Sequence, residues 1–227
     1  MVVAGKLVFD INATYGEHNI AVGFKGNDKY FAAENSTSFT VNKLDIDLSV
    51  GSDSVDYGED LVVNVTTNEK FTGDLTVYVG DYNQTAHVIN GVGSVVFAGL
   101  ARGDYFISVK FNETELCSGD AKNTQATVIG VNTPLVIVNS NPVINENVTV
   151  TVVMDYDFND NVTVNLNGVS QSRAVVNGSF AFVIENVTYG YQNITVSFNG
   201  NDKYYPVENS TSFFVDYRDT NITITAE

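Results

Sequence analysis

The sequence has no tryptophan, one cysteine, two histidines and three prolines in 227 residues. The single cysteine, Cys117, excludes an intrachain disulfide. His18 and His87 have no cysteine nearby and belong to no order of Ser, His and Asp typical of a catalytic triad. No apolar run is as long as a membrane-spanning helix. These shortages predict a protein that is not an enzyme and that does not insert into a membrane through these residues.

Basic residues are also scarce. The chain has 11 Lys and Arg against 27 Asp and Glu, which gives a net charge of −16. This charge disfavours polyanionic partners such as nucleic acids and anionic membranes. We interpret it as a solvated acidic coat on a soluble, self-repelling surface, and we expect no nucleic-acid partner.

A repeated phrase is the most informative feature that is present. Residues 26–41 read GNDKYFAAENSTSFTV, and residues 200–215 read GNDKYYPVENSTSFFV. Gly16, Gly103 and Gly190 open similar segments at a constant spacing of 87 residues. A fixed period of this length predicts a linear array of small domains rather than one large enzyme core.

The period divides the chain into four parts. We expect complete domains at 43–129 and 130–216, the second half of a domain at 1–42, and the opening strand of a following repeat at 217–227. The N-terminus lacks the basic segment and cleavage site of a secretion signal, so any signal and anchor are expected outside this piece. An alternative phase, in which 1–42 completes a sandwich with later strands, stays open.

Apolar and polar residues alternate with period two along most of the chain. Examples are 44–48, 61–65 and 75–79, which are rich in Leu, Val and Ile. Turn signals such as Asn90-Gly91 separate these runs, and no helical stripe is found. About seven short strands in each repeat predict an all-β fold of tandem Ig-like antiparallel β-sandwiches with Greek-key order.

The repeated phrase has a wider resemblance. Over 16–41 and 190–215, a Gly-opened strand and an aromatic residue lead to Gly-Asn-Asp-x-Tyr and then to Ser-Thr-x-Phe-x-Val. This pattern resembles the bacterial immunoglobulin-like repeats of large surface proteins. The Asn- and Thr-rich composition is similar to adhesin-like proteins of methanogenic archaea. The resemblance covers nearly the whole chain and implies a surface array without catalytic residues, although 112–117 (NETELC) departs from the phrase.

The loop within this phrase is a candidate ligand site. Its members are Asn27, Asp28, Lys29 and Tyr30 in one copy and Asn201, Asp202, Lys203 and Tyr204 in the other. An exposed tyrosine there would stack on a sugar or contact a protein. The alternative is a tyrosine that fills the end of the sandwich, which is the commoner use of an aromatic residue and the one we favour.

A second candidate site is the acidic stretch DYDFNDN at 155–161. With Asp155, Asp157 and Asp160 as candidate ligands, the stretch resembles the start of a calcium loop, because Asp155, Asp157, Asn159 and Asn161 place oxygen ligands at alternate positions. The stretch lacks the Gly and the bidentate Glu of an EF-hand. We therefore favour a polar turn with at most weak calcium binding, and no other cofactor is predicted.

Triplets for N-glycosylation are the densest motif. Their acceptors are Asn12, Asn35, Asn64, Asn83, Asn112, Asn147, Asn161, Asn177, Asn186, Asn193, Asn209 and Asn221. Many of these triplets are expected from a composition rich in Asn and Thr. In an extracellular setting, some of them would be glycosylated.

These observations predict a non-catalytic, adhesin-like repeat region at the extracellular cell surface, acting as a stalk or in attachment to cells. Two alternatives stay open: a glycan-binding module that uses the Asn-Asp-Lys-Tyr loop, and an accessory region of a secreted hydrolase. The expected partner is a cell-surface protein or glycan. The apolar face of 1–42 and the strand at 217–227 also predict head-to-tail self-association.

Overall fold

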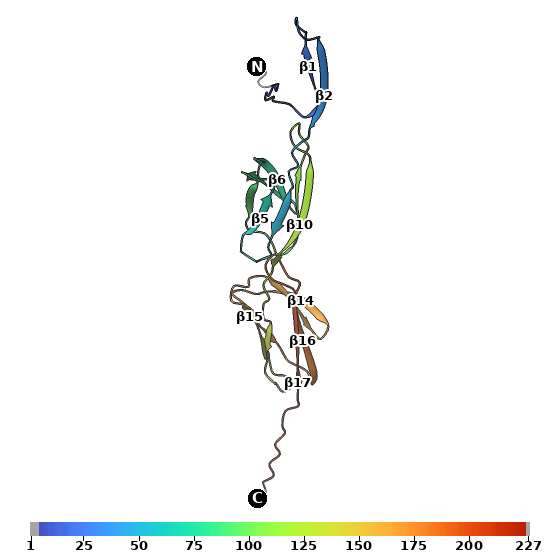
Figure 1. The fold of residues 1–227 in the computed structure, drawn as a ribbon. Helices are drawn as coiled ribbons and strands as arrows, with labels where there is room; N and C mark the ends of the chain where they lie inside the picture. The colour runs from blue at the N-terminus through green and yellow to red at the C-terminus, as the bar shows by residue number, and fades with distance from the viewer. Residues whose placement is uncertain (1–4, 226–227) are drawn as a thin grey trace. The chain divides into compact units, whose positions relative to one another are not determined.

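The computed structural model describes residues 5–225 and is built from strands and turns, with no helix in that range (Figure 1). The strands are β1 (Gly16–Phe24), β2 (Ala33–Val41), β3 (Ser49–Ser52), β4 (Val55–Asp56), β5 (Leu61–Thr66), β6 (Gly73–Val79), β7 (Tyr82–Val88), β8 (Val92–Phe97), β9 (Gly103–Phe111), β10 (Asp120–Ile129), β11 (Val136–Val138), β12 (Val148–Val153), β13 (Asn161–Leu166), β14 (Val169–Ala174), β15 (Ser179–Ile184), β16 (Gly190–Phe198) and β17 (Val207–Val215). The predicted all-β class is confirmed. The described residues contain no helix long and apolar enough to span a membrane.

The chain divides into two compact units. The first runs to Asp53 and includes 60–98 and 104–126; the second holds 54–59, 99–103 and the chain from Thr127 onward. The predicted bounds at 43–129 and 130–216 follow the sequence period instead, and they stay predictions.

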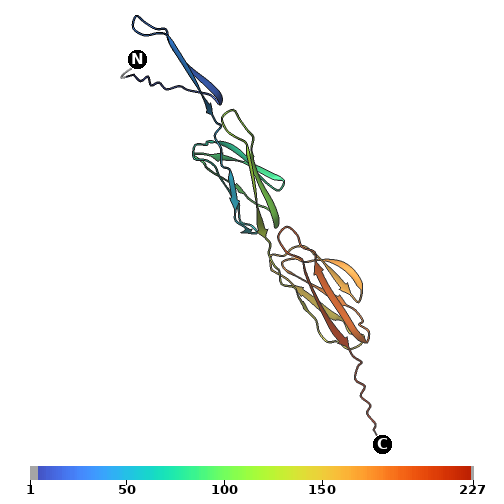
Figure 2. The same ribbon diagram turned by 45° about the vertical axis from the view of Figure 1, so that its right-hand side comes forward.

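Five sheets hold these strands (Figure 2). The hairpin β1-β2 forms a two-stranded sheet by itself. Sheets of order β3-β5-β8 and β4-β10-β9-β6-β7 follow, and then sheets of order β11-β12-β15 and β14-β13-β16-β17. The pairs in β1-β2, β3-β5-β8, β9-β6-β7, β11-β12-β15 and β14-β13-β16-β17 are antiparallel, whereas the short contact of β4 with β10 is parallel. Some strands, such as β9 and β6, are neighbours in a sheet but not in the sequence. The connections between such strands are crossovers.

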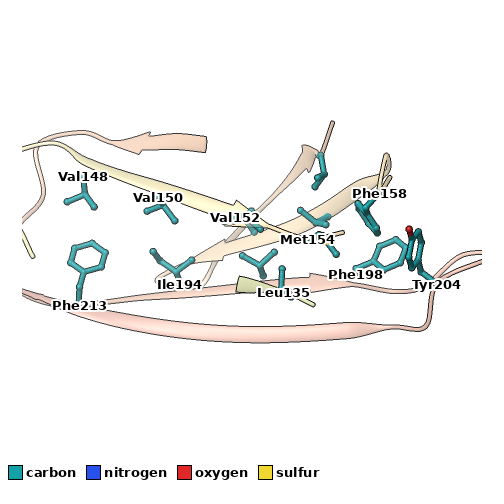
Figure 3. Packing of buried hydrophobic residues seen from close by; sticks show 14 of the residues in the cluster. Leu135, Val148, Val150, Val152, Met154, Phe158, Ile194, Phe198, Tyr204 and Phe213 are labelled. Atoms are coloured by element: carbon teal, nitrogen blue, oxygen red, sulfur yellow. The ribbon is translucent and has the colours of Figure 1, made fainter. Parts of the chain in front are cut away.

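The core follows from the period-two alternation. In β12, Val148, Val150 and Val152 are fully buried, because successive side chains point to opposite faces of the sheet. Figure 3 shows these three valines facing Ile194 of β16 and Phe213 of β17 across the interior of the second unit. Leu61, Val63 and Val65 of β5 are buried in the same way in the first unit.

Two Asn-Gly turns occupy equivalent positions 87 residues apart. Asn90 and Gly91 have φ values of 51° and 81°, and Asn177 and Gly178 have φ values of 51° and 74°. Positive φ at both central residues is the geometry of a type I′ turn, which Asn-Gly favours. A Cβ at Gly178 would also collide with the carbonyl oxygen of Asp155. The turn predicted at Asn90-Gly91 is thus present. Glycine is needed at position 91 for its positive φ and also for space, because a Cβ there would lie 2.7 Å from the carbonyl oxygen of Thr67.

The 87-residue period extends to main-chain hydrogen bonds. Phe71 N–H donates to the carbonyl of Asn68 at 2.9 Å, and Phe158 N–H donates to that of Asp155 at 2.9 Å. The carbonyl of each phenylalanine then accepts from Gly91 or Gly178 at 3.0 Å. The acidic stretch at 155–161 therefore begins with the same turn as its counterpart at 68–74.

Candidate binding loop

The repeated loop is held by one asparagine side chain. Between β16 and β17, the Oδ1 atom of Asn201 accepts from the N–H of Lys203 at 2.9 Å and of Tyr204 at 2.8 Å. The N–H of Asn201 donates to the carbonyl of Tyr204 at 3.1 Å. Asparagine side chains favour this Asx-type turn, since they replace a main-chain acceptor. We call residues 27–30, 114–117 and 201–204 the repeated loops.

The other two repeated loops have the same turn. Asn27 Oδ1 accepts from the N–H of Lys29 and Tyr30, both at 2.9 Å. In the middle loop, Thr114 Oγ1 accepts from Cys117 N–H at 3.1 Å, and Thr114 N–H donates to the carbonyl of Cys117 at 3.0 Å. Sequence reasoning missed Thr114 because the phrase is absent there. The signal available was its hydroxyl, which forms such turns more weakly than an amide.

The ring of Tyr204 lies in the core, and its hydroxyl donates to the carboxylate of Asp157. Its ring centroid is 5.3 Å from that of Phe158, which in turn lies 4.8 Å from Phe198 (Figure 3). Tyr204 is 3% exposed, whereas Tyr30 in the first loop is 59% exposed. The same sequence phrase therefore presents an aromatic ring to solvent in one copy and covers it in the other.

Asp157 connects the acidic stretch to the third loop. Its carboxylate accepts hydrogen bonds from the Lys203 ammonium and the Tyr204 hydroxyl. The bond from Lys203, followed by that from Tyr204, lowers the pKa of Asp157 below its usual value. The same ion pair raises the pKa of Lys203, and burial followed by the bond to Asp157 raises the pKa of Tyr204. The cluster therefore favours a charged carboxylate beside a charged amine.

Two of the three acidic residues proposed as calcium ligands, Asp157 and Asp160, have carboxylates that accept hydrogen bonds from protein groups. Asp160 Oδ2 accepts from Asn201 Nδ2 at 3.0 Å, and its Oδ1 accepts from the N–H of Asn161 at 2.7 Å. At Asp155 the hydrogen bond is made by the main chain, whose N–H donates to Thr133 Oγ1 at 3.2 Å. No group of three His, Cys, Asp or Glu side chains gathers as metal ligands anywhere in residues 5–225. Weak calcium binding stays a prediction without a defined ligand set.

Arg102 is a residue of the second unit that the sequence did not identify as part of a site. Its Nε donates to the carbonyls of Asn201 at 2.7 Å and Tyr204 at 3.0 Å, and its N–H donates to the carbonyl of Asp202 at 2.8 Å. The guanidinium also lies 5.0 Å from the ring centroid of Tyr205. Arg102 thus closes over the third loop from its carbonyl side.

Tyr15 and Lys43 occupy the corresponding place in the first unit. Tyr15 stands 87 residues before Arg102, and the Lys43 ammonium lies 4.8 Å from its ring centroid. Lys43 Nζ also donates to the carbonyl of Thr114 at 2.7 Å. These residues line an open hollow together with Thr14 and 113–116. A cationic or aromatic side chain therefore covers the middle and the third loop alike.

Neither histidine belongs to a repeated loop. His87 Nδ1 is 2.6 Å from Asp74 Oδ1, and both side chains are exposed on paired strands. His18 Nε2 is 2.6 Å from the carbonyl oxygen of Thr14, with its ring stacked on Phe39. Neither histidine contacts a nucleophilic side chain in these interactions, and both have ordinary structural partners.

The candidate glycosylation acceptors are all exposed. They differ in the hydrogen bonds that their side-chain amides make. Asn209 Nδ2, the atom that would carry a glycan, donates to the carbonyl of Leu135 at 2.7 Å. Its counterpart 174 residues earlier is Asn35, whose Oδ1 accepts from the N–H of Ser36. Exposure therefore allows modification at every acceptor, with a competing hydrogen bond at Asn209.

No family model and no curated protein matches the sequence. Among solved structures, the chain is similar to the fibronectin(III)-like modules of Clostridium thermocellum CbhA, with 15% identity, a TM-score of 0.32, and coverage of 79% of this chain and 100% of that chain. It is also similar to the Yersinia pseudotuberculosis adhesin InvE, with 15% identity, a TM-score of 0.36, and coverage of 74% of this chain and 60% of that chain. A third similar structure is the I9–I11 tandem from titin, with 9% identity, a TM-score of 0.35, and coverage of 82% and 71%.

The chain thus spans less than two thirds of the InvE structure that it matches. At these sequence identities and TM-scores, the similarity supports no conclusion about function. The class of the protein rests on its own strands and sheets, which define an all-β chain of Ig-like antiparallel sandwiches.

Proposed function

We propose that the chain is a non-catalytic, adhesin-like repeat region at the extracellular cell surface, where its domains act as a stalk and in attachment to cells. The observation that supports it best is the recurrence of one hydrogen-bonded loop, 87 residues apart, with a side chain closing over it. Arrays of similar domains with short connections separate two points in space without any catalytic centre. The net charge of −16 adds self-repulsion that opposes collapse.

The test varies repeat number. A surface-displayed fusion carries the chain between an anchor and a tip of known specificity, with one or two further copies of 43–129 inserted. A stalk should increase the capture of beads coated with the ligand of the tip as each copy is added, because the tip stands further from the cell wall. The control is an insertion of equal length rich in Gly and Ser. Equal capture for every insert would overturn the stalk.

A second candidate is glycan binding by the first repeated loop. In that loop Tyr30 and Phe31 are both exposed, and Lys29 Nζ lies 5.3 Å from the Tyr30 ring centroid. Exposed aromatic faces beside polar groups are suited to stacking on sugar rings. Binding of the purified chain to a glycan array should then be saturable and lost in Tyr30→Ala/Phe31→Ala. Tyr82→Ala, an exposed tyrosine on β7, is the matched control, and signals unchanged in the double variant would exclude this loop.

We also propose that N-glycans cover part of this surface. After secretion from a glycosylating host, peptide mass spectrometry should find higher occupancy at Asn35 than at Asn209. The reason is that Asn209 Nδ2 already donates to Leu135, and a glycan there must break this bond. Asn209→Asp should remove the glycan signal and serve as the assignment control. Equal occupancy at both sites would contradict the role given to the hydrogen bond.

A further inference from the structure

The edge strands β7 and β14 hold equivalent positions in the two units, 87 residues apart. Ala86 of β7 lies opposite the buried Leu75, and Arg173 of β14 lies opposite the buried Val162. Residues directly opposite each other in an antiparallel pair share one face of the sheet. Ala86 and Arg173 therefore both stand on the inner face, and the second unit has an arginine where the first has an alanine.

The first unit is closed at this edge. Gln84, which lies opposite the buried Val77, donates through Nε2 to the carbonyl of Val96 in the facing sheet at 2.8 Å. Ala86 is fully buried. Three apolar residues of β6 and β8 are buried as well: Val79, Val95 and Phe97. The edge strand and the facing sheet thus meet without an apolar gap at these residues.

The second unit stays open at the equivalent place. Every residue of β14 is exposed, and Gln171, the counterpart of Gln84, accepts from Arg173 Nη2 at 2.7 Å. The counterparts of the three buried apolar residues are only half-buried: Leu166, Phe182 and Ile184. Burying a guanidinium without a charged partner is costly. Arg173 therefore opposes the closure that Ala86 allows in the first unit.

A cavity of about 160 Å³ lies at this edge of the second unit. Its apolar wall includes Leu166, Phe182 and Ile184, and its two polar side chains are those of Gln171 and Arg173. An apolar cavity of roughly 150 Å³ lined by Leu, Ile and Phe is large enough to hold a benzene ring. The size and the lining of this cavity thus fit one phenyl group.

Arg173 places an uncompensated positive charge beside this apolar wall. Within residues 5–225 the ion pairs are made by three lysines and one histidine, and Arg173 takes part in none. Its bond to Gln171 joins it to a neutral amide. A guanidinium binds a carboxylate through parallel N–H···O bonds, which are stronger than bonds to neutral groups. The charge of the site therefore selects an anion.

We propose that this cavity binds a small aromatic carboxylate, with the ring against Leu166, Phe182 and Ile184 and the carboxylate paired with Arg173. Each half of such a ligand matches one half of the site. The rim is exposed and the ligand is small, so the dissociation constant should be on the order of 1 mM. This binding does not depend on the attachment function proposed above.

Titration of the full chain with phenylacetate, followed by NMR, tests the site. The methyl signals of Leu166 and Ile184 should shift saturably. The methyl signals of Val79 and Val95 should not move, because the equivalent place in the first unit is closed. Phenylacetamide has nearly the same shape without the charge. It should bind about tenfold more weakly or worse, since it lacks the charge-assisted bonds to the guanidinium.

Two substitutions separate the two halves of the site. Arg173→Gln should weaken phenylacetate binding about tenfold and leave phenylacetamide binding nearly unchanged. Ile184→Phe introduces the residue that the first unit has at this position, Phe97, and should weaken both ligands by filling the cavity. Arg218→Gln changes another exposed arginine of the second unit and is the matched control, with no effect expected. Circular dichroism checks that each variant remains folded.

Four outcomes would overturn the proposal. The absence of saturable shifts up to about 10 mM phenylacetate would mean that the cavity does not bind this class of ligand. Equal affinity of the wild type for phenylacetate and phenylacetamide would mean that the charge is not recognised. Wild-type affinity in a folded Arg173→Gln variant would exclude the arginine. Equal shifts at the compared methyl groups of both units would mean non-specific binding.

Discussion

The hairpins β1-β2 and β16-β17 are nearly the same sequence in two environments. Their registers are equivalent, from Gly16 opposite Val41 and from Gly190 opposite Val215, through nine residue pairs each. The second hairpin joins a four-stranded sheet over a buried core, whereas the first forms a sheet of two strands. Phe198 is 6% exposed and its counterpart Phe24 is 45% exposed. The hairpin and its loop are thus specified locally, while burial depends on residues elsewhere in the chain.

Fragments test this comparison with the largest expected effect. The fragment 130–216 should unfold cooperatively in urea, because it contains both sheets around its core. The fragment 1–42 should show no cooperative transition, since an isolated two-stranded hairpin is marginal in water. Circular dichroism against urea measures both. A cooperative transition in 1–42 would mean that the hairpin needs no second sheet, and its absence in 130–216 would refute the predicted bounds.

The next largest effect is expected from a matched pair of phenylalanine truncations, one at a buried position and one at an exposed position. Phe198→Ala should lower the free energy of unfolding of its unit by about 3–5 kcal/mol, because it leaves a cavity beside Phe158. Phe24→Ala should change stability by roughly 0.5 kcal/mol or less, as expected for an exposed position. Urea unfolding of the full chain, monitored through the NMR signals of each hairpin, separates the effects of the two variants. Similar losses at both positions would show that the face of β1-β2 is covered in solution.

A smaller difference is expected for the tyrosine of the repeated loop. Tyr204→Phe removes the hydroxyl that donates to Asp157 and should destabilise the second unit by less than Phe198→Ala. Tyr30→Phe removes a hydroxyl from an exposed ring and should leave stability unchanged. The shift in thermal midpoint measures this pair. No shift for Tyr204→Phe would mean that Asp157 finds an equivalent partner in water.

The smallest effect is a pH dependence carried by Asp157. Its pKa is lowered in the folded chain, so its contribution to stability is present above the usual value of 3.8 and is lost as pH falls through the folded-state pKa. Thermal midpoints of the wild type should therefore fall more steeply on acidification below that value than those of Asp157→Asn. Asp202→Asn, an exposed carboxylate in the same loop, is the charge control. Parallel pH profiles for wild type and Asp157→Asn would contradict this role.

Much of the fold could be predicted because its signals are local. The alternation in β5 and β12 and the turn at Asn90-Gly91 depend on neighbouring residues, and the 87-residue period repeats such local signals along the chain. The loop of Asn201–Tyr204 was found for the same reason. Its partners were not: Asp157 lies 47 positions from Tyr204 and Arg102 lies 99 from Asn201, and only the folded sheets bring them together. The different exposure of Tyr30 and Tyr204 has the same origin.

The near-identity of the two hairpins has a kinetic consequence. Both present the same apolar residues in the same register, so during folding they compete for one place against β12 and β15. A chain in which β1-β2 takes that place buries similar surface but leaves β16-β17 displaced, and it must open again before the native pairing forms. Repeat chains misassemble in this way, since neighbouring copies supply near-native alternatives. Refolding of the full chain should therefore contain a slow phase that is absent when 1–42 is removed.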